Sequence, residues 1–243
     1  DDFRQPGNLQ TVASRTAIIG VIALGQLMVI LTAGIDLSVG SVAALSGVVG
    51  CLAMKSGAPM PLGVLTGCGT GMICGAVNGT LVAKGRIAPF IATLGMMMVA
   101  RGLALLVSGG KPIFGLPESF LWLGDAKDWR IPVLIVSVLG LGYMFMLLFT
   151  RFGRSLYAVG GNKQASRLSG VPVDRVLILA YTLSGLMAGL GGMMLAAKTS
   201  IGSPTAAELY ELESIAACVI GGASLMGGEG NAIAALAGAL IMF

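Results

Sequence analysis

Eight long apolar runs dominate this sequence and restrict it to a helical membrane fold. Most of them are about 17–25 residues long, enough for a helix to cross the roughly 30 Å hydrocarbon core of a bilayer. Backbone groups cannot stay unpaired in lipid, so segments this apolar must be helical. Arg101 is the only charged residue within the eight runs, which are residues 16–34, 37–54, 60–83, 87–108, 132–149, 176–197, 214–228 and 230–243.

The charge content separates this chain from soluble proteins and from most enzymes. Only 11% of its 243 residues are charged, whereas soluble domains carry about 25%. It contains no histidine, the commonest general base and metal ligand. It also lacks a GxxxxGK(S/T) phosphate loop, an HExxH zinc motif and a GxSxG nucleophile motif. We therefore expect a non-catalytic chain with no metal site and no cofactor of its own. The net charge of +4 gives no sign of nucleic-acid binding.

Lys and Arg are concentrated in two connections, which sets the expected orientation in the membrane. Residues 150–175 carry five cations against one acid, Asp174, and such an excess marks the cytoplasmic side. The connection with Lys84 and Arg86 lies two spans earlier and agrees with this side. The segments then expected outside are residues 1–15, 109–131 and 198–213. The first of these placements requires a further helix before the chain.

The glycine-bracketed loop at residues 160–170 is the first candidate for function. Its middle, residues 163–168, is long enough for one or two helical turns. It is either a solvated positive loop or a short helix that docks on a cytoplasmic partner protein. The candidate residues are Gly161, Asn162, Lys163, Ala165, Arg167, Leu168 and Gly170.

Two glycine-rich interruptions, at residues 32–41 and 220–231, are the second candidate. Each lies between apolar runs and is followed by a similar phrase, VAALSG or IAALAG, so we expect interrupted helices within an internal repeat. Asp36 is predicted to cap the helix that starts near residues 37–38. The alternative is that the breaks line a transport path. Their candidate residues are Gly34, Asp36, Ser38, Gly40, Gly222, Ser224 and Glu229.

Glycines recur every four residues in the third apolar run. This spacing draws a groove along one side of a helix and lets another backbone approach closely. We therefore expect tight helix packing along this groove. The glycines are Gly63, Gly67, Gly71, Gly75 and Gly79.

Isolated polar residues inside the runs are candidates to line a path. Arg101 lies seven residues before Ser108, about 10 Å from the outer end of its helix, where it can snorkel or form an ion pair. The other candidates are Gln26, Ser46, Asn78, Thr93, Tyr143, Tyr181 and Ser184. The four cysteines also lie in apolar runs and are interpreted as small buried hydrophobic residues.

Four blocks in series resemble the permease subunits of sugar-importing ABC transporters. They are LTAGIDLSVGSVAALSG, AKGRIAPFIATLGMMMVARG, RFGRSLYAVGGNKQASRLSG and YELESIAACVIGGASLMGGEG. The resemblance covers nearly the whole chain and is closest to the ribose-type permeases. The same superfamily serves xylose, galactose, arabinose, furanose sugars and autoinducer-2.

The resemblance implies an all-α chain of about ten helices, of which an N-terminal helix and C-terminal helices are expected to lie outside residues 1–243. These residues would form a single transmembrane permease domain, surrounded by lipid in the bacterial inner membrane and paired with an identical or related permease chain. A separate ATP-binding subunit would hold ATP and Mg²⁺, and an extracytoplasmic binding protein would deliver the sugar. The loop at residues 160–170 would be the coupling helix that docks on the ATPase.

Two rival hypotheses remain open from the sequence. The chain could be an ion-coupled secondary carrier that uses Asp36 or Glu229. It could instead be a structural or receptor subunit of a membrane complex without a path of its own.

Overall fold

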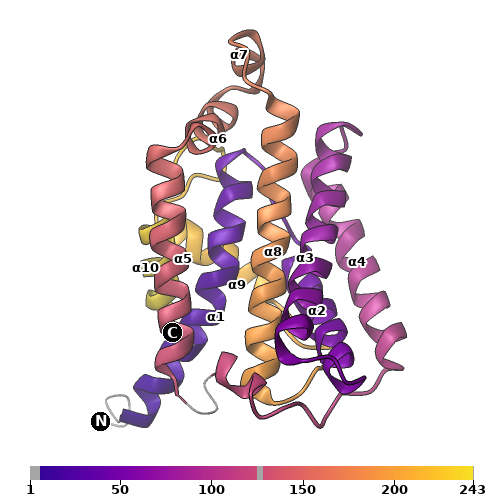
Figure 1. The fold of residues 1–243 in the computed structure, drawn as a ribbon. Helices are drawn as coiled ribbons and strands as arrows, with labels where there is room; N and C mark the ends of the chain where they lie inside the picture. Colours follow the sequence, from indigo (N-terminus) through magenta and orange to yellow (C-terminus); the bar gives the residue numbers. More distant parts are fainter. Residues whose placement is uncertain (1–5, 125–127, 243) are drawn as a thin grey trace.

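The computed structural model describes residues 6–124 and 128–242, and every regular element within them is a helix (Figure 1). Residues 1–5 and 125–127, which belong to segments expected outside the membrane, are not among the described residues. The helices are α1 (Pro6–Leu31), α2 (Val39–Lys55), α3 (Met60–Ala83), α4 (Pro89–Ser108), the 3-10 helix η2 (Phe120–Leu123), α5 (Arg130–Phe149), α6 (Arg151–Gly161), α7 (Lys163–Leu168), α8 (Val173–Thr199), α9 (Tyr210–Ile220) and α10 (Ala232–Ile241).

Each of the eight apolar runs overlaps one helix, and five of these helices are long and apolar enough to cross a membrane. The five are α1, α3, α4, α5 and α8. The seventh run, residues 214–228, is helical only as far as the start of the predicted interruption at residues 220–231. Its helix, α9, begins at Tyr210 and ends at Ile220, because Gly221 and Gly222 follow and Gly222 has a left-handed φ of +84°. The structure is thus a polytopic helical membrane protein that combines long spans with short apolar helices.

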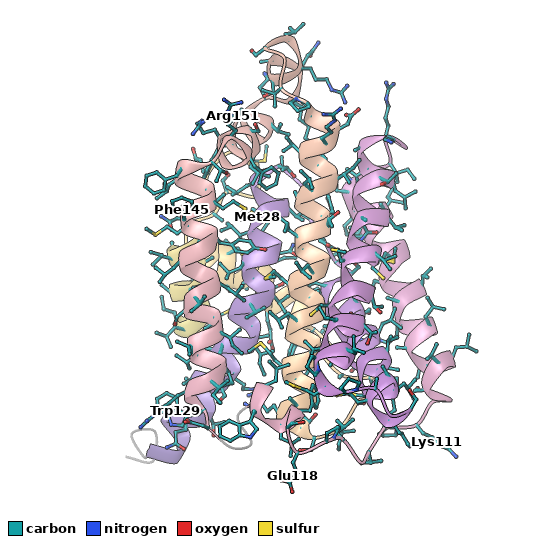
Figure 2. The ribbon with its side chains drawn as sticks, viewed as in Figure 1. Met28, Lys111, Glu118, Trp129, Phe145 and Arg151 are labelled. Carbon is teal, nitrogen blue, oxygen red and sulfur yellow. The ribbon has the colours of Figure 1, made fainter. Side chains whose placement is uncertain are left out.

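The two ends of the bundle differ in what they carry (Figures 1 and 2). α7 projects at one end, with Arg151 nearby, and Lys111 and Glu118 lie at the other. We call these the α7 end and the Lys111 end. On the side of the bundle between them, Phe145 of α5 points away from the protein and is 61% exposed, as a lipid-facing side chain is.

α1 is the most deeply enclosed of the five long helices. Within its most apolar window, 89% of the residues are buried inside the protein, against 22% for α3 and α4 and 28% for α5. α8 lies beside it, and the two helices separate α3 and α4 from α5 and α10 (Figure 1). α1 and α8 therefore form the centre of the fold, around which the more exposed helices are arranged.

The predicted glycine groove of α3 lies against α2 and α8, and all five of its glycines are buried. Towards the Lys111 end, a Cβ on Gly63 would meet α2 atoms, and a Cβ on Gly67 would meet an α2 carbonyl and the Met193 side chain of α8. Further along, a Cβ on Gly71 or Gly75 would collide with α8 backbone carbonyls. The contact between α3 and α8 is therefore one of backbone on backbone, as small residues allow in membrane proteins.

Candidate functional site

Two short helices, α6 and α7, contain the loop that the sequence singles out. Thr150 caps α6, since its Oγ1 accepts a hydrogen bond from the amide three residues on at 3.1 Å. Asn162 caps α7 in the same way, with its Oδ1 2.9 Å from the Ala165 nitrogen. α7 spans Lys163–Leu168, the residues for which one or two helical turns were predicted, and Gly170 ends the loop with a φ of +81°. Both helices have side-chain caps of their own, so the loop has a defined shape within the isolated chain.

The surface of α7 combines an apolar tip with charged neighbours. Leu168 is 86% exposed, more than any other large hydrophobic residue that the structure describes. Arg167 is engaged within the chain, because its Nη2 lies 2.6 Å from Oδ1 of Asp174 at the start of α8. Gly161, Lys163 and Ala165 are exposed.

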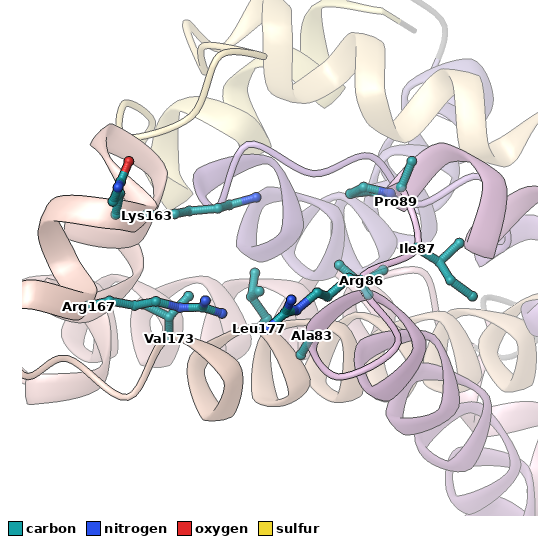
Figure 3. A pocket seen from close by; sticks show the side chains of 11 residues that line it. Ala83, Arg86, Ile87, Pro89, Lys163, Arg167, Val173 and Leu177 are labelled. Atoms are coloured by element: carbon teal, nitrogen blue, oxygen red, sulfur yellow. The ribbon is translucent and has the colours of Figure 1, made fainter.

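A cavity of about 520 Å³ lies beneath α7, between it, the α3–α4 turn and the start of α8 (Figure 3). Three cations surround it, namely Arg86 from the turn and Lys163 and Arg167 from α7. Arg86 adopts a left-handed backbone with φ of +53°. The two connections rich in Lys and Arg thus lie on one face of the molecule, as their shared orientation requires.

α6 contacts the second glycine-rich interruption and the end of α1 directly. The hydroxyl of Tyr157 donates to the Gly230 carbonyl at 2.8 Å. The Gly228 amide donates to the carbonyl of Leu31, the last residue of α1, at 3.0 Å. A Cβ on Gly160 would collide with that same carbonyl and with the Gly228 nitrogen. The end of α6, the end of α1 and the second interruption therefore meet through their backbones.

The second interruption is a turn-rich segment between α9 and α10. Gly222, Gly227 and Gly228 all have left-handed φ values, between +77° and +87°. The Ser224 amide donates to the Glu229 carbonyl at 3.0 Å, which closes the turn. The Glu229 side chain is exposed. This interruption therefore buries no charge.

The first interruption is different, because it carries a carboxylate into the interior. Asp36 is 1% exposed. Its Oδ1 accepts from the Ser38 amide at 2.9 Å and from the Ser38 hydroxyl at 2.6 Å, and its Oδ2 accepts from the Ser184 hydroxyl of α8 at 3.2 Å. The Asn78 amide of α3 donates to the Ser38 hydroxyl at 3.0 Å. With its amide oriented to satisfy both groups, Gln26 of α1 pairs with the Asp36 backbone, at 3.1 Å to its O and 3.2 Å to its N.

This buried polar centre corrects the predicted role of Asp36. α2 begins at Val39, and Asp36 binds Ser38, the residue before the helix, so it fixes the approach to α2 and does not cap its first turn. Gln26 lies five residues before the end of α1, so the centre lies about 8 Å inside that end. The first interruption therefore lies within the protein and links α1, α3 and α8.

Gly34 and Ala33 let the chain turn into this centre. Ala33 has a φ of +56°, and the Gly34 amide returns to the Val29 carbonyl at 3.1 Å, which closes the end of α1. A Cβ on Gly34 would lie 2.6 Å from the hydroxyl oxygen of Tyr181. No larger residue fits between the turn and Tyr181, a physical reason for glycine at this position.

Arg101 is held by the backbone of a distant segment of the chain. Its Nη1 donates to the carbonyls of Pro204 at 2.7 Å and Ala206 at 2.9 Å, in the segment between α8 and α9. The remaining polar candidates inside the helices, namely Gln26, Ser46, Asn78, Thr93, Tyr143, Tyr181 and Ser184, are all buried. Of these isolated polar residues within the apolar runs, Arg101 is therefore the one that is not buried.

Three polar residues beside Arg101 were absent from the predicted sites. Ser41, Glu208 and Glu211 line a pocket with it, formed by α2, α4 and the segment before α9. The two acids were interpreted only as part of an outer loop. Gly40 was among the predicted residues and lies next to Glu211. A Cβ there would collide with Glu211 Oε2 and the Ala207 carbonyl.

Several known proteins are similar to this chain. A family model described as the permease component of the branched-chain amino acid transport system matches residues 8–243. The ribose import permease protein RbsC of Escherichia coli K12 is 42% identical over 99% of this chain and 77% of its own length. RbsC of Bacillus subtilis 168 is 44% identical over 99% of this chain and 76% of its own length. The L-arabinose ABC transporter permease protein AraH of Azospirillum brasilense is 40% identical over 99% of this chain and 72% of its own length. No solved structure matches the chain.

The five long apolar helices define a multi-pass membrane protein. The family match and the sequence identities above identify its family. The chain belongs to the ABC transporter permease family that this model describes, together with the sugar permeases RbsC and AraH.

Proposed function

We propose that this chain is the permease subunit of an ATP-driven monosaccharide importer, and that its residues form one permease domain. The observation that carries the proposal is the 42–44% identity to two ribose import permeases over 99% of the chain. At such identity the α6–α7 loop, the two interruptions and the glycine groove all lie within the aligned region. The translocated substrate is then a pentose or a similar sugar.

The α6–α7 pair is the part that receives the ATPase. A separate ATP-binding subunit, which holds ATP and Mg²⁺, docks on Leu168 and its neighbours at the α7 end. Closure of the two ATPases moves α6, and α6 transmits this movement to the end of α1 and to the second interruption, which it contacts directly. The helices then alternate between openings to the two sides of the membrane.

The other partners follow from the same assignment. A sugar-binding protein docks at the Lys111 end, over the segments that precede η2 and α9. A second permease chain completes the path, and the assembly lies in the bacterial inner membrane with the α7 end in the cytoplasm. The chain itself needs no cofactor, and among its described residues no cluster of potential metal ligands occurs.

The buried polar centre supports this reading over an ion-coupled carrier. Asp36 accepts three hydrogen bonds from Ser38 and Ser184 and is sealed from both faces. Glu229 is exposed and lies outside the helices. A coupling ion needs a carboxylate that opens alternately to the two sides, whereas Asp36 is fully used in joining helices.

Reconstitution of the whole complex tests the proposed function. Proteoliposomes that contain the full-length permease, its ATPase and its binding protein are loaded with ATP and given radiolabelled ribose, fructose, arabinose or xylose. We expect accumulation of at least one sugar that needs internal ATP and that persists with an uncoupler. Uptake that the uncoupler abolishes while ATP is present would instead identify a secondary carrier.

A further inference from the structure

We propose that the pocket between α2, α4 and the start of α9 is a sugar-contact site in the half of the translocation path nearest the Lys111 end. This inference rests on the proposed function and assigns a place to its substrate. The pocket has a volume of about 320 Å³, within the range of about 300–1,000 Å³ that is common for small-molecule sites. Its polar side chains are Ser41, Arg101, Glu208 and Glu211.

The charged lining of the pocket favours contact with water over contact with lipid. Arg101 lies seven residues before the end of α4, about 10 Å inside the Lys111 end. Its guanidinium is held by the Pro204 and Ala206 carbonyls, in the segment between α8 and α9. Charged groups at such depth face a protein interior or a water-filled cavity, because lipid does not solvate them. In the proposed site, the open side of this pocket faces water within the path.

The backbone around the pocket is arranged to present these groups. Glu208 stands between Ala207, with φ of +55°, and Leu209, with φ of +66°. Two left-handed non-glycine residues so close together are strained, and such strain concentrates at functional sites. On the other side, the Glu211 carboxylate lies against Gly40 at the start of α2, in a space that a Cβ would fill. A glycine and two strained residues thus bring α2 and the acids together.

The chemistry of the pocket suits a monosaccharide. Sugar hydroxyls both donate and accept hydrogen bonds, so they pair with the two carboxylates, with the free donors of Arg101 and with the Ser41 hydroxyl. The C–H face of a sugar ring can pack on Met98 and Leu209, which are 65% and 62% exposed. Acids and a cation together give a neutral hydroxylated solute more partners than they give an ion of either sign.

Thiol accessibility tests whether the pocket faces water. In a full complex whose permease has its four native cysteines replaced, Met98→Cys is expected to react with a charged, membrane-impermeant thiol reagent, because the thiolate forms only in contact with water. Phe145→Cys, on the exposed face of α5, is the matched control and is expected to remain unlabelled. Equal labelling of the two positions, or no labelling of Met98→Cys, would show that the pocket faces lipid or protein and would overturn the proposal.

Uptake by the reconstituted complex tests the contact with sugar. Glu211→Gln is expected to slow uptake of the accepted sugar about tenfold, the usual effect of weakening a hydrogen bond to a charged group. Glu213→Gln is the control on the same helix, since Glu213 interacts with Arg15 and does not line the pocket. This control is expected to retain uptake within twofold.

Deoxy analogues separate sugar contact from structural damage. For the analogue that lacks the hydroxyl bound by Glu211, the ratio of wild-type to Glu211→Gln uptake is expected to fall towards one. A ratio that stays the same for every monodeoxy analogue, a loss of permease dimer in Glu211→Gln, or equal losses in Glu211→Gln and Glu213→Gln would refute the site. A wild-type complex that accumulates none of the four sugars would instead refute the proposed function, and the labelling result would still decide whether the pocket is wet.

Discussion

Truncation of Leu168 is the most direct test of how this permease holds its ATPase. The side chain stands at the tip of α7 and is 86% exposed, so nearly all of it is available for burial in a partner. Leu168→Ala removes three carbon groups, each worth about 0.8 kcal/mol of transfer free energy. Scaled by the exposed fraction, the loss is about 2 kcal/mol, or about 30-fold in the dissociation constant.

The dissociation constant can be measured by titration of the purified ATPase onto the permease in lipid nanodiscs. Leu106→Ala is a matched control, because Leu106 is 76% exposed near the opposite end of α4. It is expected to leave the constant unchanged. A Leu168→Ala permease that binds the ATPase within threefold of wild type would show that α7 is not an anchor and would refute the reasoning.

Arg167 is a less direct probe of the same surface. It is paired with Asp174 within the chain, so Arg167→Glu also sets two acids side by side at the junction of α7 and α8. We expect this variant to weaken ATPase association. A weaker association would combine the effect of damage to the α7–α8 junction with the effect of damage to the docking surface.

Three further variants test the interior of the protein. Asp36→Ala leaves Ser38 and Ser184 without an acceptor, so we expect the free energy of unfolding to fall by about 1–3 kcal/mol. A lower unfolding temperature in detergent would show this. A complex of normal stability that has lost uptake would favour a role in the path. Gly75→Ala drives a methyl group into the Tyr181 carbonyl and is expected to destabilise the fold by about 1–3 kcal/mol. Gly69→Ala on the same helix meets no atom within 4 Å and is expected to be tolerated. Equal unfolding temperatures for the two variants would contradict the packing. Tyr157→Phe removes the hydrogen bond to Gly230 and is expected to lower sugar uptake per ATP hydrolysed while ATPase binding persists, and an unchanged ratio would show that this contact carries no coupling.

The helices were predictable because lipid imposes a simple rule on the chain. An apolar run in a membrane must form its backbone hydrogen bonds within itself, so each run overlaps a helix. Helix ends were less predictable, as α9 shows, because its start at Tyr210 lies among acids that had been assigned to a loop. α6 was also not predicted as a helix, although Thr150 is of a residue type that often caps helices. In the structure its hydroxyl accepts a hydrogen bond from the Gly153 amide.

The buried polar centre could not be predicted from the local pattern around Asp36. Ser38 is two residues away, but Ser184 is 148 residues distant along the chain, and Asn78 lies 40 residues from Ser38. Only the packing of α1, α3 and α8 brings these groups together. The sequence alone therefore revealed that a carboxylate is unusual here, and the fold revealed what satisfies it.

The backbone contact along the glycine groove also decides which part of the molecule is free to move. Gly71 and Gly75 of α3 meet Gly185 of α8 with no side chain between them, so the two helices cannot slide or tilt without collision. α3 and α8 therefore form one rigid pair. α4, by contrast, buries only four of its residues, Ala92, Thr93, Ala100 and Ala104, and all four are small. α4 is also fastened to the segment before α9 by the two hydrogen bonds of Arg101, so a movement of α4 in the proposed transport cycle would have to break those two bonds.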